Sequence, residues 1–223
     1  MPSKTSRRAT EPVFLIRQRQ CEMTIPIKET IVKSAINTVN PKAVKYPLPI
    51  RCLHWVRAAL IIGLIASGWY MTRLPESDMA TASIFYPNHK QFGILVWLLA
   101  LVHLALRSRY AKSMPSALPA LAPWERILSH AVHKLLILLT LLVPLLGYSL
   151  SSSFSQSDGV PFFFIPHLPE LLPKNDNAFT VFQTLHRYGA YVILVLIGVH
   201  VLGALKHRLM DKGGPTDVLS RMV

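Results

Sequence analysis

The sequence is poor in acidic residues and in cysteine. Its 223 residues include 11 Asp and Glu against 24 Lys and Arg, so the formal net charge is +13, and there are two cysteines. It also lacks C-x-x-C pairs, phosphate-cradling glycine loops and the catalytic motifs of hydrolases. Zinc-binding, nucleotide-hydrolysing and conventional hydrolytic functions therefore have no motif to support them.

Apolar residues are abundant instead, and they gather in four blocks. They make up 51% of the sequence. A membrane span needs about 20 helical residues. The first block has that length, and the others reach it when they are extended to His89, His130 and Phe179. No block has a polar face along its whole length, which argues against the alternative of core helices in a soluble protein. We therefore predict an all-α integral membrane protein, a four-helix bundle built on residues 52–72, 92–106, 135–150 and 188–205.

The basic residues are distributed unevenly among the connections. Ten precede the first block, and the second connection and the tail are also basic, whereas the third connection has only Lys174. By the positive-inside rule, both termini and the second connection are cytoplasmic. Membrane topology thus accounts for the charge, and no nucleic-acid partner is expected. Cys21 and Cys52 would both lie on the cytoplasmic side, where a disulfide is not expected.

The chain divides into an arm and a membrane domain. Residues 1–45 are polar and basic and contain no apolar stretch long enough for a secretory signal. We expect them to be a disordered cytoplasmic arm that can lie against anionic lipid, with Met23 as an alternative start. Residues 46–223 form the transmembrane domain. Within it, 114–123 should be an extended linker, and the apolar segment 160–169 should fold back onto the membrane surface or the bundle.

Histidines are the main candidates for function, because ionisable side chains are costly in a membrane span. His54 and His200 lie near the cytoplasmic surface, and His89 and His186 lie near the external one. His186 and His200 are fourteen residues apart, about 21 Å along a helix, and face a similar direction. One helix could therefore serve two stacked planar cofactors, each completed by a histidine from another helix. Paired imidazoles suit b-type haem, although a histidine at a helix end is also an ordinary interfacial residue.

The apolar blocks with these histidines resemble the bacterial cytochromes b561. The resemblance lies in RCLHWVRAALIIGLIASGWYM, with its Leu-His-Trp, in HKQFGILVWLLALVHLALR, in HAVHKLLILLTLLVPLLGYSL, in LHRYGAYVILVLIGVHVLGALKH, and in the tail LKHRLMDKGGPTDVLSRMV. It covers about residues 46–223 and implies two haem b groups in a bacterial inner membrane. It also implies that His54 and His200 are the iron ligands of the cytoplasmic haem, and that His89 and His186 are those of the external haem.

Further polar residues near the predicted ligands are weaker candidates. His103 is a rival ligand for the cytoplasmic haem or a polar core residue. Basic side chains can neutralise haem propionates or anchor a helix at the interface. Histidines at helix ends can border a haem or a quinone, or can be interfacial residues that reach toward water. The candidates of these two kinds are Arg57, Lys90, Arg187, His130, His133 and His207.

The resemblance implies respiratory electron transfer across the membrane, coupled to a membrane quinone with ubiquinone as the expected substrate. Some family members resemble a superoxide:quinone oxidoreductase, and Lys90 with Arg187 would attract superoxide at the external face. Two alternatives remain. One is a cytochrome b subunit that anchors a dehydrogenase or hydrogenase, and the other is a haem-free bundle whose histidines relay protons. The expected partners are membrane lipid, quinone and an unidentified electron donor or acceptor, with an oligomer or a redox partner subunit as further candidates.

Overall fold

A computed structural model describes residues 45–115, 121–157 and 159–223. This part of the chain contains four long helices: α2 (Leu48–Met71), α3 (Met79–Arg109), α4 (Pro123–Ser153) and α5 (Asp176–Met210). All four are long and apolar enough to cross a membrane. The predicted four-helix transmembrane fold is therefore confirmed. The arm, Cys21 and Met23 lie outside the described residues.

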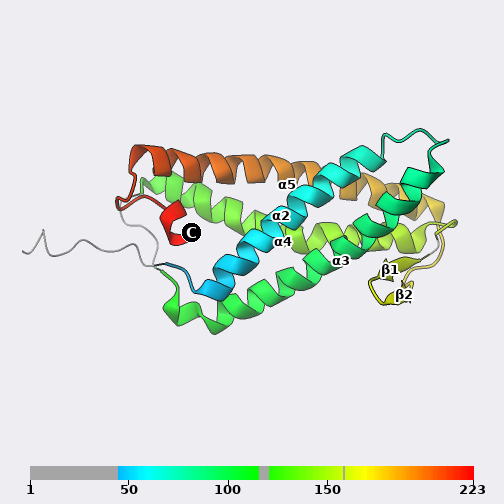
Figure 1. Cartoon of the computed structure of the whole chain (residues 1–223), viewed down its shortest axis with the longest axis horizontal. Coiled ribbons are helices and arrows are strands. Elements are labelled where there is room, and N and C mark those ends of the chain that lie inside the picture. Colours follow the sequence, from blue (N-terminus) through cyan, green and yellow to red (C-terminus); the bar gives the residue numbers. More distant parts are fainter. Residues whose placement is uncertain (1–44, 116–120, 158) are drawn as a thin grey trace, which may run out of the picture. The chain divides into compact units, whose positions relative to one another are not determined.

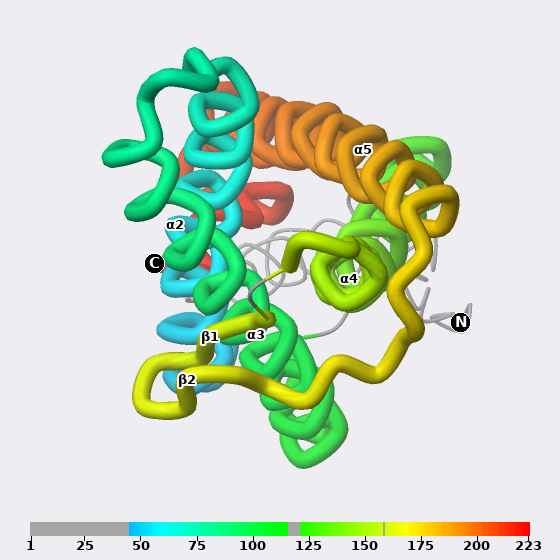
Figure 2. The backbone as a smooth tube through the Cα atoms, turned by 90° about the vertical axis from the view of Figure 1, so that its right-hand side faces the viewer, coloured from blue at the N-terminus to red at the C-terminus, as the bar shows by residue number. Residues whose placement is uncertain are grey.

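The helices pack as two close pairs joined through α3 and α4. Packing is most extensive between α4 and α5, followed by α2 with α3 and then α3 with α4. Figures 1 and 2 show how the four helices are arranged. Gly189 permits the close approach of α5 to α4, because a Cβ there would lie 2.7 Å from Cγ2 of Val143. Among the described residues, the backbone of α5 does not pack closely on α2 or α3. The bundle is therefore held together mainly by the contacts of α4 with α5, of α2 with α3 and of α3 with α4.

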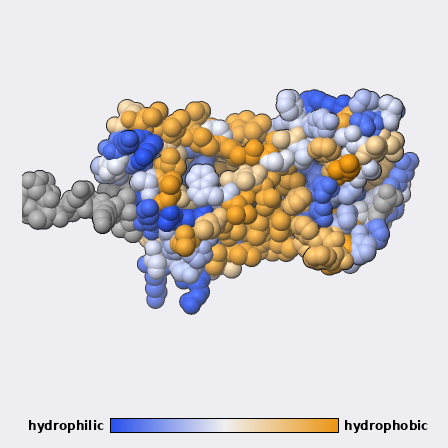
Figure 3. All heavy atoms as spheres, in the orientation of Figure 1, coloured by the Kyte–Doolittle hydropathy of each residue, from blue (hydrophilic) through white to orange (hydrophobic). Residues whose placement is uncertain are grey.

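Apolar side chains cover the middle of the bundle. Figure 3 shows a hydrophobic band along the helices with hydrophilic groups toward both ends. Large apolar side chains such as Ile62, Leu138 and Val195 are exposed. Exposed apolar surface of this extent fits a lipid environment rather than water. We call the end that carries His54 and His200 the inner end, and the end that carries His89 and His186 the outer end. The placement of the inner end in the cytoplasm stays a prediction.

The helices extend beyond the apolar blocks, which corrects two predicted positions. His89 does not begin its helix, because α3 starts ten residues earlier at Met79. His130 does not begin its helix either, since Pro123 opens α4 instead of ending the linker. Hydropathy reports only the part of a helix inside lipid. Polar contacts support the ends outside it, such as Asp78 accepting a hydrogen bond from the N–H of Thr81 at 3.1 Å.

The connection between α4 and α5 contains a small hairpin that the sequence did not predict. Strands β1 (Val160–Phe162) and β2 (Ile165–Leu168) are antiparallel, and β1 packs on α3. Lys90 Nζ donates a hydrogen bond to the carbonyl of Gly159 at 3.0 Å. Gln91 Oε1 accepts one from the N–H of Phe163 at 3.2 Å. This segment thus folds back onto the bundle, where α3 holds it.

The tail closes the inner end. The N–H of Tyr46 donates to the carbonyl of Arg221 at 3.0 Å, and Trp55 Nε1 donates to the carbonyl of Met222 at 3.0 Å. Buried Asp217 pairs with Arg208 at 2.6 Å. Burial alone would raise the pKa of Asp217, but hydrogen bonds from the backbone N–H of Gly213, from Arg208 and from the backbone N–H of Ser220 lower it overall. The last residues therefore tie α5 to the start of α2.

Candidate functional site

The four predicted ligand histidines form two facing pairs, and α5 contributes one ring to each. At the inner end the ring centroids of His54 and His200 are 6.1 Å apart, with their planes at 61°. At the outer end the centroids of His89 and His186 are also 6.1 Å apart, with their planes at 80°. These are the pairs that helix depth predicted. The partners come from α2 and α3, the two helices whose backbones do not pack closely on α5.

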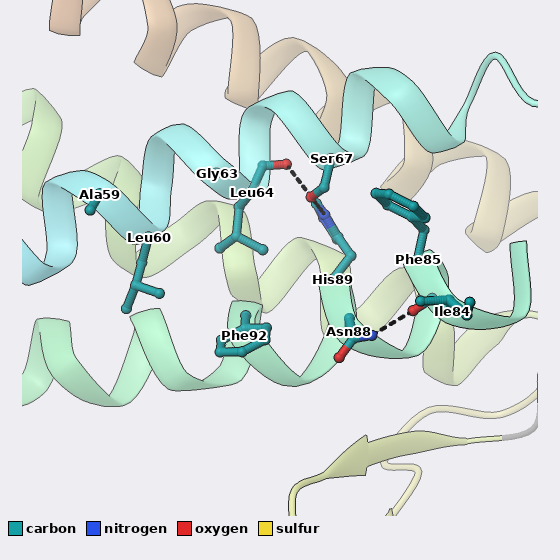
Figure 4. Close-up of a pocket in the computed structure, with 10 residues that line it drawn as sticks. All are labelled: Ala59, Leu60, Gly63, Leu64, Ser67, Ile84, Phe85, Asn88, His89 and Phe92. Carbon is teal, nitrogen blue, oxygen red and sulfur yellow. Dashed lines mark hydrogen bonds between the residues drawn. The ribbon is translucent and has the colours of Figure 1, made fainter. Parts of the chain in front are cut away.

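At the outer end, each imidazole has one nitrogen occupied by a neighbouring helix. His186 Nδ1 lies 2.9 Å from the carbonyl oxygen of Val143, to which an N–H at that position donates. His89 Nδ1 lies 3.1 Å from Ser67 Oγ, and Figure 4 shows these two side chains pointing toward each other from α2 and α3. Because the serine hydroxyl donates to the carbonyl of Leu64 at 3.1 Å, its oxygen can accept from the imidazole. Both rings then keep Nε2 for a metal, the arrangement usual for metal-binding histidine.

Two glycines make room for these outer rings. A Cβ at Gly147 of α4 would lie 2.9 Å from Cε1 of His186, and one at Gly68 of α2 would lie 3.0 Å from Cε1 of His89. A larger residue at either position would displace the imidazole or the helix. Sequence reasoning missed Gly68, Gly147 and Ser67. In the sequence these three positions stand out only as small residues inside apolar helices. Such residues are common in membrane proteins, so they did not point to the site.

An apolar pocket lies beside His89, between α2 and α3 (Figure 4). It has a volume of about 320 Å³. Leu64, Phe85 and Phe92 contribute apolar walls, and Ser67 and His89 bring polar atoms to it. Pockets that bind cofactors and small molecules are mostly apolar, with a few polar groups placed in them. This pocket gives the outer histidine an apolar surrounding on the side of α2.

The inner pair has a third imidazole next to it. The ring centroid of His133 on α4 is 4.9 Å from that of His200. His133 Nδ1 lies 2.6 Å from the carbonyl oxygen of Ser129, so this ring too has one nitrogen engaged. Within the described residues, no group of three His, Cys, Asp or Glu side chains is placed to hold a metal ion. His133 is therefore a neighbour of the His54–His200 pair and not part of a three-residue metal site among the residues that the structure describes.

A buried cation lies near the inner pair. Arg57 is 8% exposed, and its Nη2 donates to Thr140 Oγ1 at 2.9 Å. Its Nε is buried and has no hydrogen-bond partner in the described part of the chain, and the same is true of Nδ1 of His103. The structure thus brings Arg57 and His133 to the inner histidines, and it leaves His103 with an unsatisfied buried nitrogen.

The other predicted candidates are engaged elsewhere or exposed. Lys90 bonds to Gly159 and so helps to hold the hairpin. His207 lies 3.7 Å from Glu125, which also pairs with Lys206 at 2.6 Å. His130 and Arg187 are exposed. The structure therefore does not bring His207 into contact with the paired histidines.

The two pairs are compatible with haem. Two imidazoles that bind one metal ion from opposite sides have ring centroids roughly 6 Å apart. This value is the sum of two metal–nitrogen bonds of about 2.0 Å and the distance from each nitrogen to the centre of its ring. Both observed separations of 6.1 Å agree with that value. The occupied Nδ1 atoms of His89 and His186 fix which nitrogen is presented. The residues present therefore fit bis-imidazole haem at both ends.

Comparison with known proteins identifies the family. Residues 45–223 match the family model described as prokaryotic cytochrome b561. Cytochrome b561 homolog 2 of Escherichia coli (strain K12) is 27% identical over 183 residues, which covers 80% of this chain and 91% of the relative. Cytochrome b561 homolog 1 of the same organism is 27% identical over 164 residues, with 72% and 88% covered. With four transmembrane helices and this match, the chain belongs to the prokaryotic cytochrome b561 family, multi-pass bacterial membrane proteins that transfer electrons with haem b.

Proposed function

We propose that this protein carries electrons across the bacterial inner membrane between a membrane quinone, with ubiquinone as the expected substrate, and a second redox partner. Two haem b groups would be held by His54 with His200 and by His89 with His186. The observation that carries the proposal is that one helix, α5, presents two imidazoles, each facing a histidine of another helix at 6.1 Å. Bound haem supplies reversible one-electron chemistry.

The protein residues have two tasks in this function. The first is spacing, because His186 and His200 lie on one continuous helix and are about 21 Å apart along it. The second is orientation, since the Val143 carbonyl and the Ser67 hydroxyl hold the outer rings and make them more basic ligands.

His133 supports a quinone contact at the inner end. Its ring lies next to His200, its side chain is exposed, and its Nδ1 is engaged by Ser129. The remaining nitrogen can therefore exchange a hydrogen bond with a quinone oxygen. At the outer end, superoxide is the proposed electron donor. The exposed cation of Arg187, next to His186 in the chain, supports it by attracting an anion.

Counting haems tests the proposal. The purified full-length protein should give two b-type haems per chain in the pyridine haemochrome assay. His186→Ala should lose the outer haem and His200→Ala the inner one, while His167→Ala in the hairpin should keep both. Absence of haem from the wild type would refute the proposal, and two haems in both ligand variants would refute the pairing.

Redox titration then tests the substrates. Under anaerobic conditions, ubiquinol should reduce the wild-type haems, and in a separate experiment superoxide should reduce them. Reduction by neither would exclude the proposed substrates while leaving the haem assignment intact. A soluble subunit that co-purifies in constant ratio would favour the alternative role as the membrane anchor of a dehydrogenase or hydrogenase.

A further inference from the structure

Within the described residues, the inner half of the bundle contains a buried positive charge with no acidic residue near it. Arg57 is 8% exposed and lies one helical turn beyond His54 on the same face of α2. The four helices contain two acidic residues, Glu125 and Asp176, and both lie in the first turn of a helix. Neither can reach the interior of the bundle at Arg57.

The hydrogen bond from Arg57 to Thr140 does not neutralise the guanidinium. Its Nη2 donates to Thr140 Oγ1 at 2.9 Å. The threonine hydroxyl donates its own proton to the carbonyl of Ile137 at 3.0 Å, so toward Arg57 it acts as an acceptor. Thr140 is therefore a neutral support that sets the direction of the guanidinium. Among the described residues, the charge itself and the buried Nε remain without a counterpart.

A second unsatisfied donor or acceptor lies in the same region. Nδ1 of His103 on α3 is buried and makes no hydrogen bond to any residue that the structure describes. The charged and titratable groups that act electrostatically on His103 are Arg57, Arg107 and His54, all of them basic. Two helices, α2 and α3, thus bring basic groups to one interior region beside His54. An unpaired buried charge is strongly unfavourable, so such a region requires an anion.

We propose that Arg57, held by Thr140 and joined by His103, binds a carboxylate of the haem that His54 and His200 hold. This inference rests on the proposed function, because it requires that haem. A carboxylate supplies the negative charge and the acceptor oxygens that Arg57 Nε and the His103 ring lack. A guanidinium is the side chain best suited to it, since its planar fork matches two carboxylate oxygens.

Redox titration of the haem-loaded protein is the first test. Arg57→Met should lower the midpoint potential of the inner haem, because removing a nearby cation disfavours the added electron, and should leave the outer haem unchanged. Arg57→Lys, which keeps the charge, should lower it less and guards against misfolding. Arg109→Met removes a cation from the exposed end of α3 and should change neither potential. An unchanged inner potential in Arg57→Met would overturn the proposal.

Haem exchange is the second test, and it identifies the carboxylate. The dimethyl ester of haem keeps the iron and the ring but has no free carboxylate. At the inner site of the wild type, the ester should bind about tenfold more weakly than haem, as expected for loss of a charge-assisted pair. In Arg57→Met the two should bind equally, while at the outer site their ratio should not depend on Arg57.

The outcomes separate this inference from the proposed function. If His200→Ala retains the inner haem, the proposed ligand pair is wrong. If His200→Ala loses that haem but the ratio of haem to ester affinity is the same in the wild type and in Arg57→Met, only the carboxylate assignment is wrong. An unchanged ratio together with lost reduction by ubiquinol would assign Arg57 to the quinone instead.

Discussion

The two ends of the bundle hold histidine pairs at the same separation but surround them differently. At the outer end, the rings contact neutral groups, a serine hydroxyl and a backbone carbonyl, and two glycines leave room for them. At the inner end, a third imidazole and the buried Arg57 lie nearby. The outer end is organised by steric fit, whereas the inner end is organised by charge. The two sites should therefore respond to different substitutions.

Steric fit at the outer end predicts the largest effect. In Gly147→Val, the new side chain would occupy the position of the His186 ring, whose Cε1 lies 2.9 Å from an added Cβ. We expect the haem count to fall from two to one per chain, with the outer haem lost, and overpacking to cost about 1–3 kcal/mol of stability. Pyridine haemochrome and thermal unfolding measure the two effects. Gly203→Ala is the matched control, because nothing lies within 4 Å of its Cβ position. Two retained haems in Gly147→Val would show that the outer site is not limited by space.

His133→Leu sharpens the comparison from the inner side. This substitution removes the third imidazole, which lies 4.9 Å from that of His200, and leaves the outer end untouched. We expect both haems to remain and the rate of reduction by ubiquinol to fall about tenfold, as for loss of a hydrogen bond worth about 1.4 kcal/mol. Stopped-flow spectroscopy under anaerobic conditions measures that rate. His130→Leu, one turn earlier and exposed, tests whether the effect is specific to His133. An unchanged rate in His133→Leu would move the quinone site elsewhere.

Ser67→Ala should have a moderate effect confined to the outer end. The Nδ1 atom of His89 would lose its acceptor at 3.1 Å, and the imidazole would become a weaker donor to iron. A neutral hydrogen bond contributes about 1 kcal/mol, so we expect the outer haem to dissociate about fivefold faster. Transfer of haem to apomyoglobin measures that rate. Ser83→Ala, at an exposed position on α3, should behave like the wild type. Faster loss of the inner haem alone would contradict the assignment.

The smallest expected effect concerns the tail that fastens the inner end. Asp217 has a lowered pKa: burial opposes ionisation, but bonds from Gly213, Arg208 and Ser220 outweigh it. Its contribution is therefore complete above the unfolded value of about 3.9 and is lost as pH falls through the lower folded value. Asp217→Asn should reduce stability at neutral pH and approach the wild type in acid. Thermal unfolding in detergent at both pH values tests this. If the stability difference between the wild type and Asp217→Asn became larger in acid, the direction of the pKa shift would be wrong.

Much of the outline was predictable from the sequence because lipid imposes a simple rule. An apolar segment of about 20 residues forms a helix in a membrane, where its backbone must satisfy its own hydrogen bonds. The spacing of His186 and His200 on one such helix predicted that both rings face a similar direction, and each ring does face a histidine of another helix. That these pairs bind haem stays a prediction. The predicted start at His89 was wrong, because the polar turns from Met79 onward belong to α3 although they lie outside the apolar block. The hairpin was missed because α3 contacts hold it in place.

The sequence by itself determined that four helices cross a membrane and that one of them carries two histidines on a similar face, since hydropathy and helical period are local properties. Only the tertiary structure decided which atoms surround each ring. Ser67, Gly147 and Arg57 act across helix boundaries on residues far away in the chain. No periodicity within a single helix records those contacts, because they depend on how neighbouring helices are placed and rotated against each other.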